Sequence, residues 1–378
     1  MKIGVLTYYG DLNCGTNLQA YATYSAIKRT YPNDTVKVIP FHGFRPEIRP
    51  YKSYNPASVF RDFVRMKKYR DFKRNKLGIK GDDPVIKNVE AALKYIASLC
   101  FDRIYVGADT LLELDRVGID GLSAYWLKDI NADKILIAAS SKNVTYEGLS
   151  ARQKEEMKKA VGQFKHIGVR DSATMKLLSY FLPSEKIHHV PDPTFTMDID
   201  KNATRRYLAK KRLNIPSKSV FMHLYGNDSW ADELAKHFKS CGYTIVTPRP
   251  YKFSDIVLND MGPLEQLGIY GYFELVITHR FHDCVFCLKN STPFLVYVKS
   301  RKTFMTADND SKHISLLKDF GLYPYGFLGC VDDGIPSETI DAKITVLKNK
   351  FNTVNIVAQM SEVKQRYFDF LHMTVSNN

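Results

Sequence analysis

The segment Val276–Phe286, VITHRFHDCVF, holds the densest group of chemically capable side chains. After an apolar run come His279, Arg280, His282 and Asp283, and an apolar helical pattern follows. Arg280 and His282 lie two residues apart at the expected helix start, so the arginine can bind negative charge while the histidine moves a proton. We favour such an anion and proton-transfer site. A structural role and a metal site are the alternatives, although a histidine pair at the usual helical metal spacing is absent from this segment.

Two strand ends earlier in the chain carry charged side chains. Arg170 lies in GVRDS, where its planar guanidinium suits a carboxylate or a phosphate. The alternative for Arg170 is a structural Arg–Asp pair. Asp109 ends YVGAD and could orient a sugar hydroxyl or act as a base, or else cap the next segment.

The turn Asp11–Asn17 follows the first apolar run, KIGVLTYY, and precedes an amphipathic helical pattern. Gly15 would allow close backbone approach or a positive φ, and Thr16 and Asn17 could cap the helix, which leaves its first amides for an anion. Plain helix capping is the alternative.

Short apolar runs that alternate with helical patterns must position these residues. Six runs in the first half, from KIGVLTYY to KIHHVPD, and four in the second half, from VFMHLYG to PFLVYV, predict parallel sheets covered by helices on both faces. A polar, charged stretch separates the two series. We therefore predict two Rossmann-like domains, residues 1–196 and 201–350, with ligands at the carboxyl ends of the strands. Residues 351–378 form a helical pattern that can pack back on the first domain.

A basic insertion, about residues 44–80, interrupts the first domain. Between Phe60 and Lys76 it carries eight basic residues and two aspartates, and Phe60, Phe63, Val64 and Phe72 can share one helical face. Such a helix can lie on an anionic membrane surface or face a charged acceptor. The alternative is a solvated helix whose aromatic face packs on the domain.

The composition limits which classes of protein this chain can belong to. The chain has 378 residues, 44% of them hydrophobic, and a formal net charge of +14, which favours anionic partners. We expect a cytoplasmic protein, with peripheral contact at the inner membrane face through the basic segment 60–76, because signal-peptide and membrane-spanning patterns are missing. The six cysteines are unevenly spaced, and Cys284 and Cys287 are expected to be buried thiols. Nucleic acid is not expected as a partner, since the sequence has no binding signature for it.

Several segments, in order, resemble the successive motifs of the polysaccharide pyruvyl transferase family. They run from residue 4 to about 322: GVLTYYGDLNCGTNLQAYATYSAIK, FDRIYVGAD, ILIAAS, IGVRDSATMKLL, VPDPTF, ELVITHRFHDCVFCLKNSTPFLVYV and SKHISLLKDFGL. The resemblance implies a GT-B-like α/β fold of two facing Rossmann-like domains with parallel sheets. It also implies an enzyme that moves the enolpyruvyl group of phosphoenolpyruvate onto two hydroxyls of a sugar. The product is a pyruvate ketal on a cell-surface polysaccharide or a lipid-linked oligosaccharide, and phosphate is released.

The resemblance also implies roles for particular residues. Arg170, Arg280 and His282 match the positions associated with phosphoenolpyruvate and catalysis. Our hypothesis is that the two arginines bind the phosphate and carboxylate, that His282 is the general acid or base, and that His279 lies among the substrate-binding residues. Neither a metal nor a cofactor is then required. The residues expected on the acceptor side of the cleft are Asn13, Gly15, Thr16 and Asp109.

One motif departs from the family pattern. The family commonly has G-S-D-x-V-W where this chain has Gly107 to Leu112, so the aromatic residue that could stack on a sugar is missing and the acceptor is expected to differ. Two other functions remain open: a GT-B-type glycosyltransferase that uses a sugar nucleotide, and a non-catalytic glycan-binding relative.

Overall fold

The computed structural model contains two compact units, each built on a parallel β-sheet. It describes residues 1–10, 12–41, 56–81, 86, 88–112, 122–141, 144–224, 229–300, 311–334 and 340–375. One unit comprises Met1–Lys52, Tyr69–Met197 and Val363–Asn378, and the other comprises Ser53–Lys68 and Asp198–Glu362. Asp11 and residues 44–55 of the predicted insertion lie outside the described residues.

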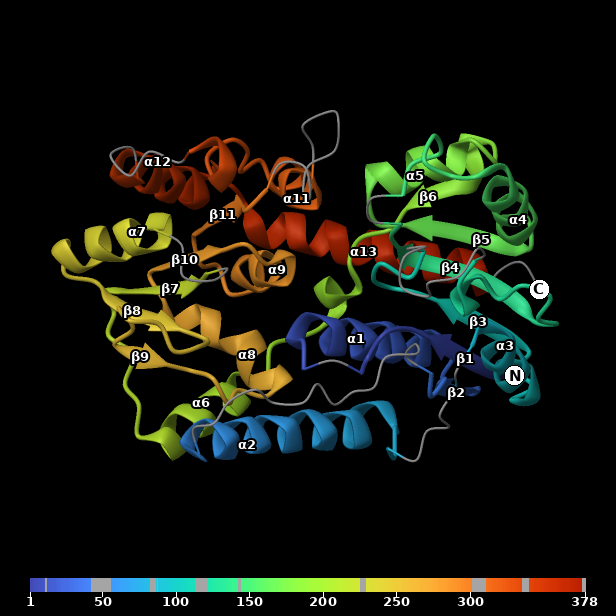
Figure 1. Ribbon diagram of the computed structural model, residues 1–378, viewed down its shortest axis with the longest axis horizontal. Helices are drawn as coiled ribbons and strands as arrows, with labels where there is room; N and C mark the ends of the chain where they lie inside the picture. The colour runs from blue at the N-terminus through green and yellow to red at the C-terminus, as the bar shows by residue number, and fades with distance from the viewer. Residues whose placement is uncertain are drawn as a thin grey trace. The chain divides into compact units, whose positions relative to one another are not determined.

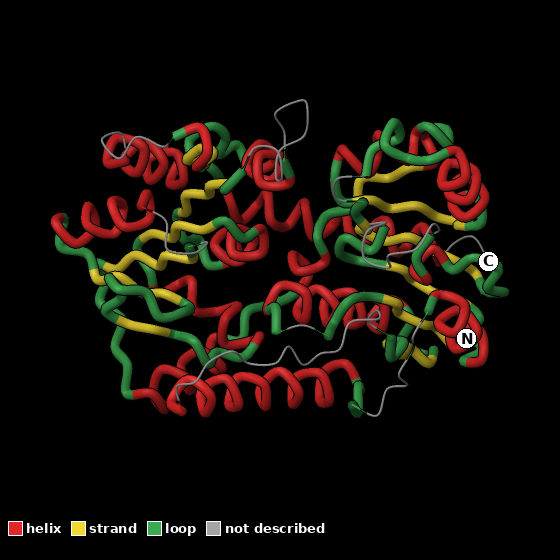
Figure 2. The backbone as a smooth tube through the Cα atoms, viewed as in Figure 1, coloured by secondary structure: helices red, strands yellow, loops and turns green. Residues whose placement is uncertain are grey.

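The sheet of the first unit has the strand order β2-β1-β3-β4-β5-β6 (Figures 1 and 2). Its strands are β1 (Lys2–Leu6), β2 (Thr35–Val38), β3 (Arg103–Val106), β4 (Asp133–Ala139), β5 (Phe164–Val169) and β6 (Ile187–His189). Its helices are α1 (Cys14–Thr30), α3 (Val89–Ser98), α4 (Ala151–Val161), α5 (Ser172–Ser179) and the short η1 (Lys73–Leu77), η2 (Ala124–Trp126), η3 (Ser184–Lys186) and η4 (Pro193–Thr196). All six strands fall on the six predicted apolar runs, and every pairing is parallel, as predicted.

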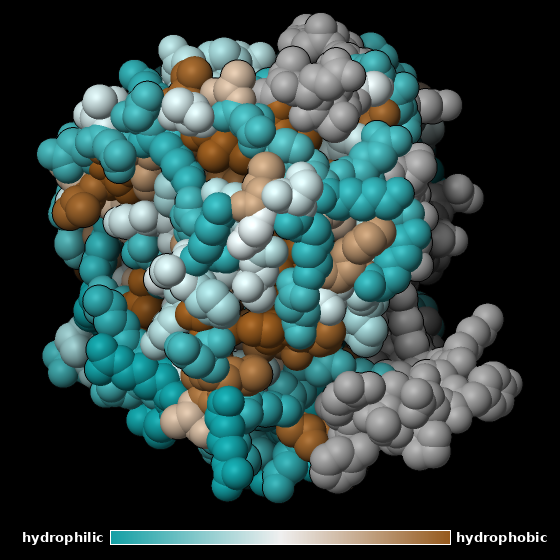
Figure 3. Space-filling view, turned by 90° about the vertical axis from the view of Figure 1, so that its left-hand side faces the viewer, coloured by the Kyte–Doolittle hydropathy of each residue, from teal (hydrophilic) through white to brown (hydrophobic). Residues whose placement is uncertain are grey.

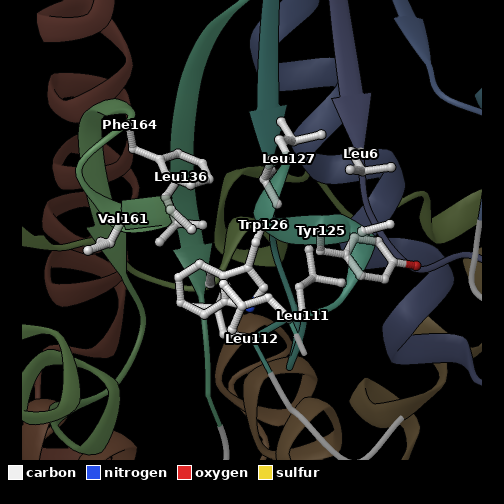
Figure 4. Close-up of a cluster of buried hydrophobic side chains, with 14 of the residues drawn as sticks. Leu6, Leu111, Leu112, Tyr125, Trp126, Leu127, Leu136, Val161 and Phe164 are labelled. Atoms are coloured by element: carbon white, nitrogen blue, oxygen red, sulfur yellow. The ribbon is translucent and has the colours of Figure 1, made fainter. Parts of the chain in front are cut away.

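Alternate strand residues bury the two faces of this sheet under different helices. One face packs against α3, α4, α5 and η2, and Figure 4 shows Trp126 there beside Leu112. The other face packs against α1 and against α13 (Ile356–Val375), which contributes Tyr367, Phe370 and Leu371. The end of the chain is therefore part of the core of the first unit.

The sheet of the second unit has the strand order β12-β11-β10-β7-β8-β9. Its strands are β7 (Ser219–His223), β8 (Thr244–Thr247), β9 (Ile256–Val257), β10 (Leu275–Thr278), β11 (Phe294–Val298) and β12 (Phe327–Cys330). Its helices are α6 (Lys201–Lys211), α7 (Ser229–Ser240), α8 (Pro263–Ile269), α9 (Phe281–Lys289), α11 (Lys312–Asp319), α12 (Ile340–Thr353), η5 (Tyr270–Tyr272) and η6 (Val331–Asp333). The four predicted runs form β7, β8, β10 and β11, whereas the sequence did not indicate the short strands β9 and β12.

The basic segment forms the helix α2 (Pro56–Phe72). Residues 53–68 cluster with the second unit, whereas the sequence assigned the whole insertion to the first domain. Lys68 explains the difference, because its ammonium donates to Glu265 at 2.8 Å and lies 4.7 Å from the ring centre of Tyr207. Phe72 is buried but Phe63 is 58% exposed, so the aromatic residues do not pack on the protein as one face.

Hydrophilic residues dominate the surface of the face shown in Figure 3, and hydrophobic residues appear there in small separate areas. Within the described ranges, no helix is long and apolar enough to cross a membrane.

Candidate active site

The carboxyl ends of three neighbouring strands bring polar residues together in the second unit. Strands β10, β7 and β8 are adjacent, and Thr278 at the end of β10 is the register partner of His223 at the end of β7. Arg249 follows the end of β8. Because parallel strands end at the same edge of a sheet, these residues share the edge at which ligands bind in α/β proteins.

Helix α9 begins immediately after β10 and carries the motif that the sequence singled out. Arg280 is the N-cap residue, with extended φ of −98°, and its backbone amide donates to the Thr278 hydroxyl at 2.9 Å. The first turn of α9 contains His282 and Asp283. His282 is half-buried, with ring centroids of Phe281 and Phe286 at 5.5 and 6.1 Å.

Asp283 is buried and accepts three hydrogen bonds from different elements. Its carboxylate is 2.6 Å from His223 Nδ1, 2.6 Å from the Tyr270 hydroxyl and 2.7 Å from the Thr278 hydroxyl. Burial alone would raise the pKa of Asp283, but His223 and these hydrogen bonds lower it to about 2. The carboxylate is therefore ionised at neutral pH, and His223 presents a protonated Nδ1 to it.

His279 is held as a neutral imidazole. Burial first, and then the nearby His223 and Arg280, lower the pKa of His279 to about 3. Its Nδ1 lies 2.9 Å from the backbone carbonyl oxygen of His223, which can only accept, so this nitrogen carries the proton. His279 thereby ties the end of β10 to the end of β7.

His313 on α11 is a second neutral histidine in this region. It is 2% exposed, and its ring centroid is 6.1 Å from that of Phe281. Burial and the neighbouring Lys312 lower the pKa of His313 to about 3.

Arg249, which follows β8, lies close enough to Arg280 and Arg65 for their charges to interact. The pKa of Arg249 is lowered, first by burial and then by the positive charges of Arg65 and Arg280, while Asp62 acts in the opposite direction. Within the part of the chain that the structure describes, the guanidinium groups of Arg249 and Arg280 make neither a hydrogen bond nor an ion pair. Positive charges left close together in this way can be neutralised by an anion.

The first unit has its own polar group at strand ends. Asp109 follows β3 with a positive φ of 86°, a conformation that costs energy in a residue other than glycine. Its carboxylate accepts from the Thr16 hydroxyl at 3.2 Å and from the Thr110 amide at 2.8 Å. Gly107 is required nearby, because a Cβ there would lie 1.7 Å from the Ile137 carbonyl oxygen.

Arg170 is buried and paired inside the first unit. Its Nη1 donates to Asp192 at 2.9 Å, and Asp192 also accepts from Gln19 Nε2 at 2.7 Å. Burial opposes the charge of Arg170, but Asp192, Asp109 and Asp171 raise its pKa, so it stays charged. These contacts are those of the structural Arg–Asp pair that the sequence left open, with Asp192 as the partner.

The opening turn differs from its prediction. Asn13 is the N-cap of α1, and its side chain accepts from the Gly15 amide at 3.0 Å. The expectation that Thr16 and Asn17 cap the helix was therefore wrong, since both lie within its first turn. Gly15 is also inside α1 and is not among the described residues with positive φ. Helix capping, one of the two functions left open for this turn, is seen at Asn13.

The structure thus brings His279, Arg280 and His282 together in the second unit and joins Thr16 to Asp109 in the first. Sequence reasoning missed His223, Arg249 and Tyr270. His223 and Arg249 carried a usable signal, because His223 ends an apolar strand and Arg249 follows one, and both are polar like the residues that were singled out.

Residues that could hold a metal form one described cluster elsewhere. His237 and Cys241 on α7 and Asp341 on α12 have ligand atoms within 4.8 Å of one another, and His237 Nε2 is 2.9 Å from the Asp341 carboxylate. Cys241 precedes β8, so this cluster lies at the amino-end edge of the sheet, opposite His223 and Arg280.

Cys284 and Cys287, as expected, are buried, and burial raises the pKa of both thiols.

Residues 13–299 match the family model described as polysaccharide pyruvyl transferase. No curated protein matches the sequence significantly.

Solved structures with different sequences share the fold. A UDP-GlcNAc 2-epimerase from Methanocaldococcus jannaschii is 11% identical with a TM-score of 0.59, over 99% of this chain and 100% of that one. The enzyme of the same name from Neisseria meningitidis, bound to UDP-GlcNAc, is 11% identical with a TM-score of 0.58, over 99% and 100%. A glycosyltransferase from Rickettsia africae is 10% identical with a TM-score of 0.51, over 99% and 97%. The predicted GT-B-like α/β fold is confirmed, and these likenesses show the fold alone.

Proposed function

Because the chain belongs to the polysaccharide pyruvyl transferase family, we propose that it transfers the enolpyruvyl group of phosphoenolpyruvate to two hydroxyls of a sugar. In this reaction both sugar oxygens bond to the central carbon of phosphoenolpyruvate, whose bond to the phosphate oxygen breaks. One hydroxyl proton converts the methylene group to a methyl group, and the other leaves with the phosphate. The product is a cyclic pyruvate ketal, and no oxidant or reductant is needed.

The arginine group at the strand ends of the second unit is the observation that carries this proposal. Phosphoenolpyruvate bears a phosphate and a carboxylate on a three-carbon frame. The guanidinium groups of Arg249 and Arg280 lie near each other without a described hydrogen-bonding partner, which supports binding of both anionic groups there. His282, two residues after Arg280, is proposed as a general acid or base.

Arg170 receives a positioning role in place of the direct contact with phosphoenolpyruvate that the sequence suggested. Its guanidinium is buried against Asp192, and its charge also acts on Asp109. On the first unit we assign Asp109 and Thr16 to the hydroxyl groups of the acceptor. The strained backbone of Asp109 supports this assignment, since such conformations concentrate at functional sites.

The burial of Leu112 supports the proposal that the acceptor sugar does not stack on an aromatic ring at position 112. It is fully buried in the core of the first unit beside Trp126 (Figure 4), so it offers no surface to a sugar. The acceptor sugar is proposed to belong to a cell-surface polysaccharide or to a lipid-linked oligosaccharide.

Helix α2 supports a peripheral contact with an anionic membrane. Phe63 is exposed on it, as are the basic side chains of Lys67 and Arg70. An apolar side chain among cationic ones is the pattern of helices that lie on a lipid surface.

A glycosyltransferase that uses a sugar nucleotide is the second candidate. It is favoured by the fold, which resembles that of an epimerase bound to UDP-GlcNAc, and by the ability of two arginines to hold a diphosphate. Thermal unfolding distinguishes the two functions: phosphoenolpyruvate should raise the Tm and UDP-GlcNAc should not, whereas the reverse result would favour the glycosyltransferase. A glycan-binding relative without activity would respond to neither donor.

The direct test measures phosphate release from phosphoenolpyruvate in the presence of lipid-linked oligosaccharide. Arg249→Gln and Arg280→Gln should each raise the KM for phosphoenolpyruvate at least roughly tenfold, because each removes a charged donor from an anion. Arg206→Gln is the matched control, since Arg206 is exposed on α6 of the same unit. Unchanged kinetics in both site variants would contradict the assignment of the donor site.

A further inference from the structure

We propose that His223, held by Asp283, is a second proton-transfer group of this enzyme and takes the proton from an attacking acceptor hydroxyl. This proposal rests on the proposed function, because ketal formation uses two hydroxyl groups and each loses a proton.

The hydrogen bonds of His223 fix which nitrogen can act. Nδ1 lies 2.6 Å from the ionised carboxylate of Asp283, so it carries a proton and donates it to that oxygen. When the ring is neutral, its lone pair therefore lies on Nε2, which makes no hydrogen bond to any residue that the structure describes. The side chain of His223 is 15% exposed, so it is largely enclosed but still reaches the surface of the unit. Nε2 is therefore the nitrogen left to receive a proton.

Asp283 is built to stabilise the charge that appears when Nε2 is protonated. The Tyr270 and Thr278 hydroxyls hold the carboxylate at 2.6 and 2.7 Å, and its position in the first turn of α9 places it at the positive end of that helix. Burial and the charge of Asp283 raise the pKa of Tyr270, so this phenol remains a donor. A fixed carboxylate behind an imidazole orients the ring and stabilises the imidazolium, as in hydrolases with a catalytic triad.

The location of His223 matches that of the proposed donor site. His223 is the register partner of Thr278, and Arg280 follows Thr278 by two residues. His279 donates to the backbone carbonyl of His223 at 2.9 Å, and the two ring centroids are 5.3 Å apart. Among the described residues, Asp283 bonds to Nδ1 of His223, His279 bonds to its backbone carbonyl, and Tyr270 bonds to Asp283.

The proton balance gives the two histidines separate tasks. His223 Nε2 takes the proton of the first hydroxyl as its oxygen bonds to the central carbon, and it passes this proton to the departing phosphate. His282, as the proposed general acid, supplies the proton that converts the methylene group to a methyl group, and the second hydroxyl restores that proton to His282. The sum is one ketal and one hydrogen phosphate from one phosphoenolpyruvate and one diol.

The test compares phosphate release by His223→Gln and His223→Ala with that of the wild type. Glutamine can still donate to Asp283 and should preserve the fold, which near-UV circular dichroism checks. Both variants should lose about 10²- to 10⁴-fold in kcat with little change in the KM for phosphoenolpyruvate. Added imidazole should restore part of the activity of His223→Ala and none in His223→Gln, whose side chain fills the space.

Asp283→Asn separates proton transfer from a structural role. Loss of the carboxylate disfavours the imidazolium, so the acid limb of the kcat–pH profile should move to lower pH as kcat falls. Tyr270→Phe removes a hydrogen bond to the same carboxylate but leaves its charge in place, so it should move that limb less than Asp283→Asn does. Wild-type kcat in His223→Gln, or an unmoved acid limb in Asp283→Asn, would overturn the role of His223 alone. A wild-type protein that releases no phosphate would overturn the proposed function and the role of His223 with it.

Discussion

Two buried neutral histidines should make the second unit unusually sensitive to acid. Burial lowers the pKa of His279 and of His313 to about 3 each, whereas an unfolded histidine titrates near pH 6.5. The folded state keeps its full stability with respect to these two histidines above about pH 6.5. This stability is lost as the pH falls toward about 3, because the unfolded chain then binds protons that the folded chain cannot. Each histidine lowers the free energy of unfolding by about 1.4 kcal/mol for each pH unit below about 6.5. The pair should therefore lower it by about 4 kcal/mol at pH 5.

Urea unfolding between pH 7.5 and pH 5 measures this loss. The chain has two tryptophans, one in each unit, so in a Trp126→Phe background the emission of Trp230 reports on the second unit. His313→Gln should reduce the slope of unfolding free energy against pH by about half, since one of two titrating groups is gone. Asp283, with a pKa of about 2, contributes only below about pH 4 and does not interfere. A slope that His313→Gln leaves unchanged would refute the reasoning.

Three further predictions concern other parts of the chain. Gly107→Ala should destabilise the first unit by more than about 3 kcal/mol, because the added Cβ meets a backbone carbonyl oxygen, and the loss should be seen as a lower Tm. Gly78→Ala is the control: positive φ is the only obstacle there, so this change should destabilise the protein by about 1 kcal/mol. The protein should sediment with anionic vesicles but not neutral ones, less so at high salt, and Phe63→Ser should weaken this binding; equal binding to neutral vesicles would refute the electrostatic part. A thiol reagent should label Cys284 and Cys287 only after unfolding, and rapid labelling of the native protein would contradict their burial.

The sequence predicted the architecture well because the signal is repeated along the chain. Each of the ten apolar runs is followed by a polar turn and a helical pattern, and each became a strand of a parallel sheet. The strands it missed lack that signal: β9 has only two residues, and β12 contains Gly329 in the run Phe327–Cys330. The boundaries between the units were harder to predict, because contacts such as Lys68 with Glu265 join residues far apart in sequence.

The candidate site was only partly predictable, for a related reason. A motif of adjacent residues such as Thr278–Asp283 is visible in the sequence, and it did place His279, Arg280 and His282 at one strand end. Pairing between distant segments is invisible, so the sequence could not show that Asp283 turns toward His223 or that Arg170 is enclosed with Asp192. Residue type and strand position can propose a ligand contact, but burial decides whether the side chain can reach one.

The contribution of α13 to the first unit has a consequence for biosynthesis. The core of that unit needs Tyr367, Phe370 and Leu371, which a ribosome makes after all of Asp198–Glu362. At common elongation rates the intervening segment takes roughly 10–30 s to produce, during which one face of the β1–β6 sheet lacks the helix that covers it. The nascent first unit should therefore depend on chaperones until termination, and expression that stops before Val363 should give aggregated protein even though every strand of both sheets is present.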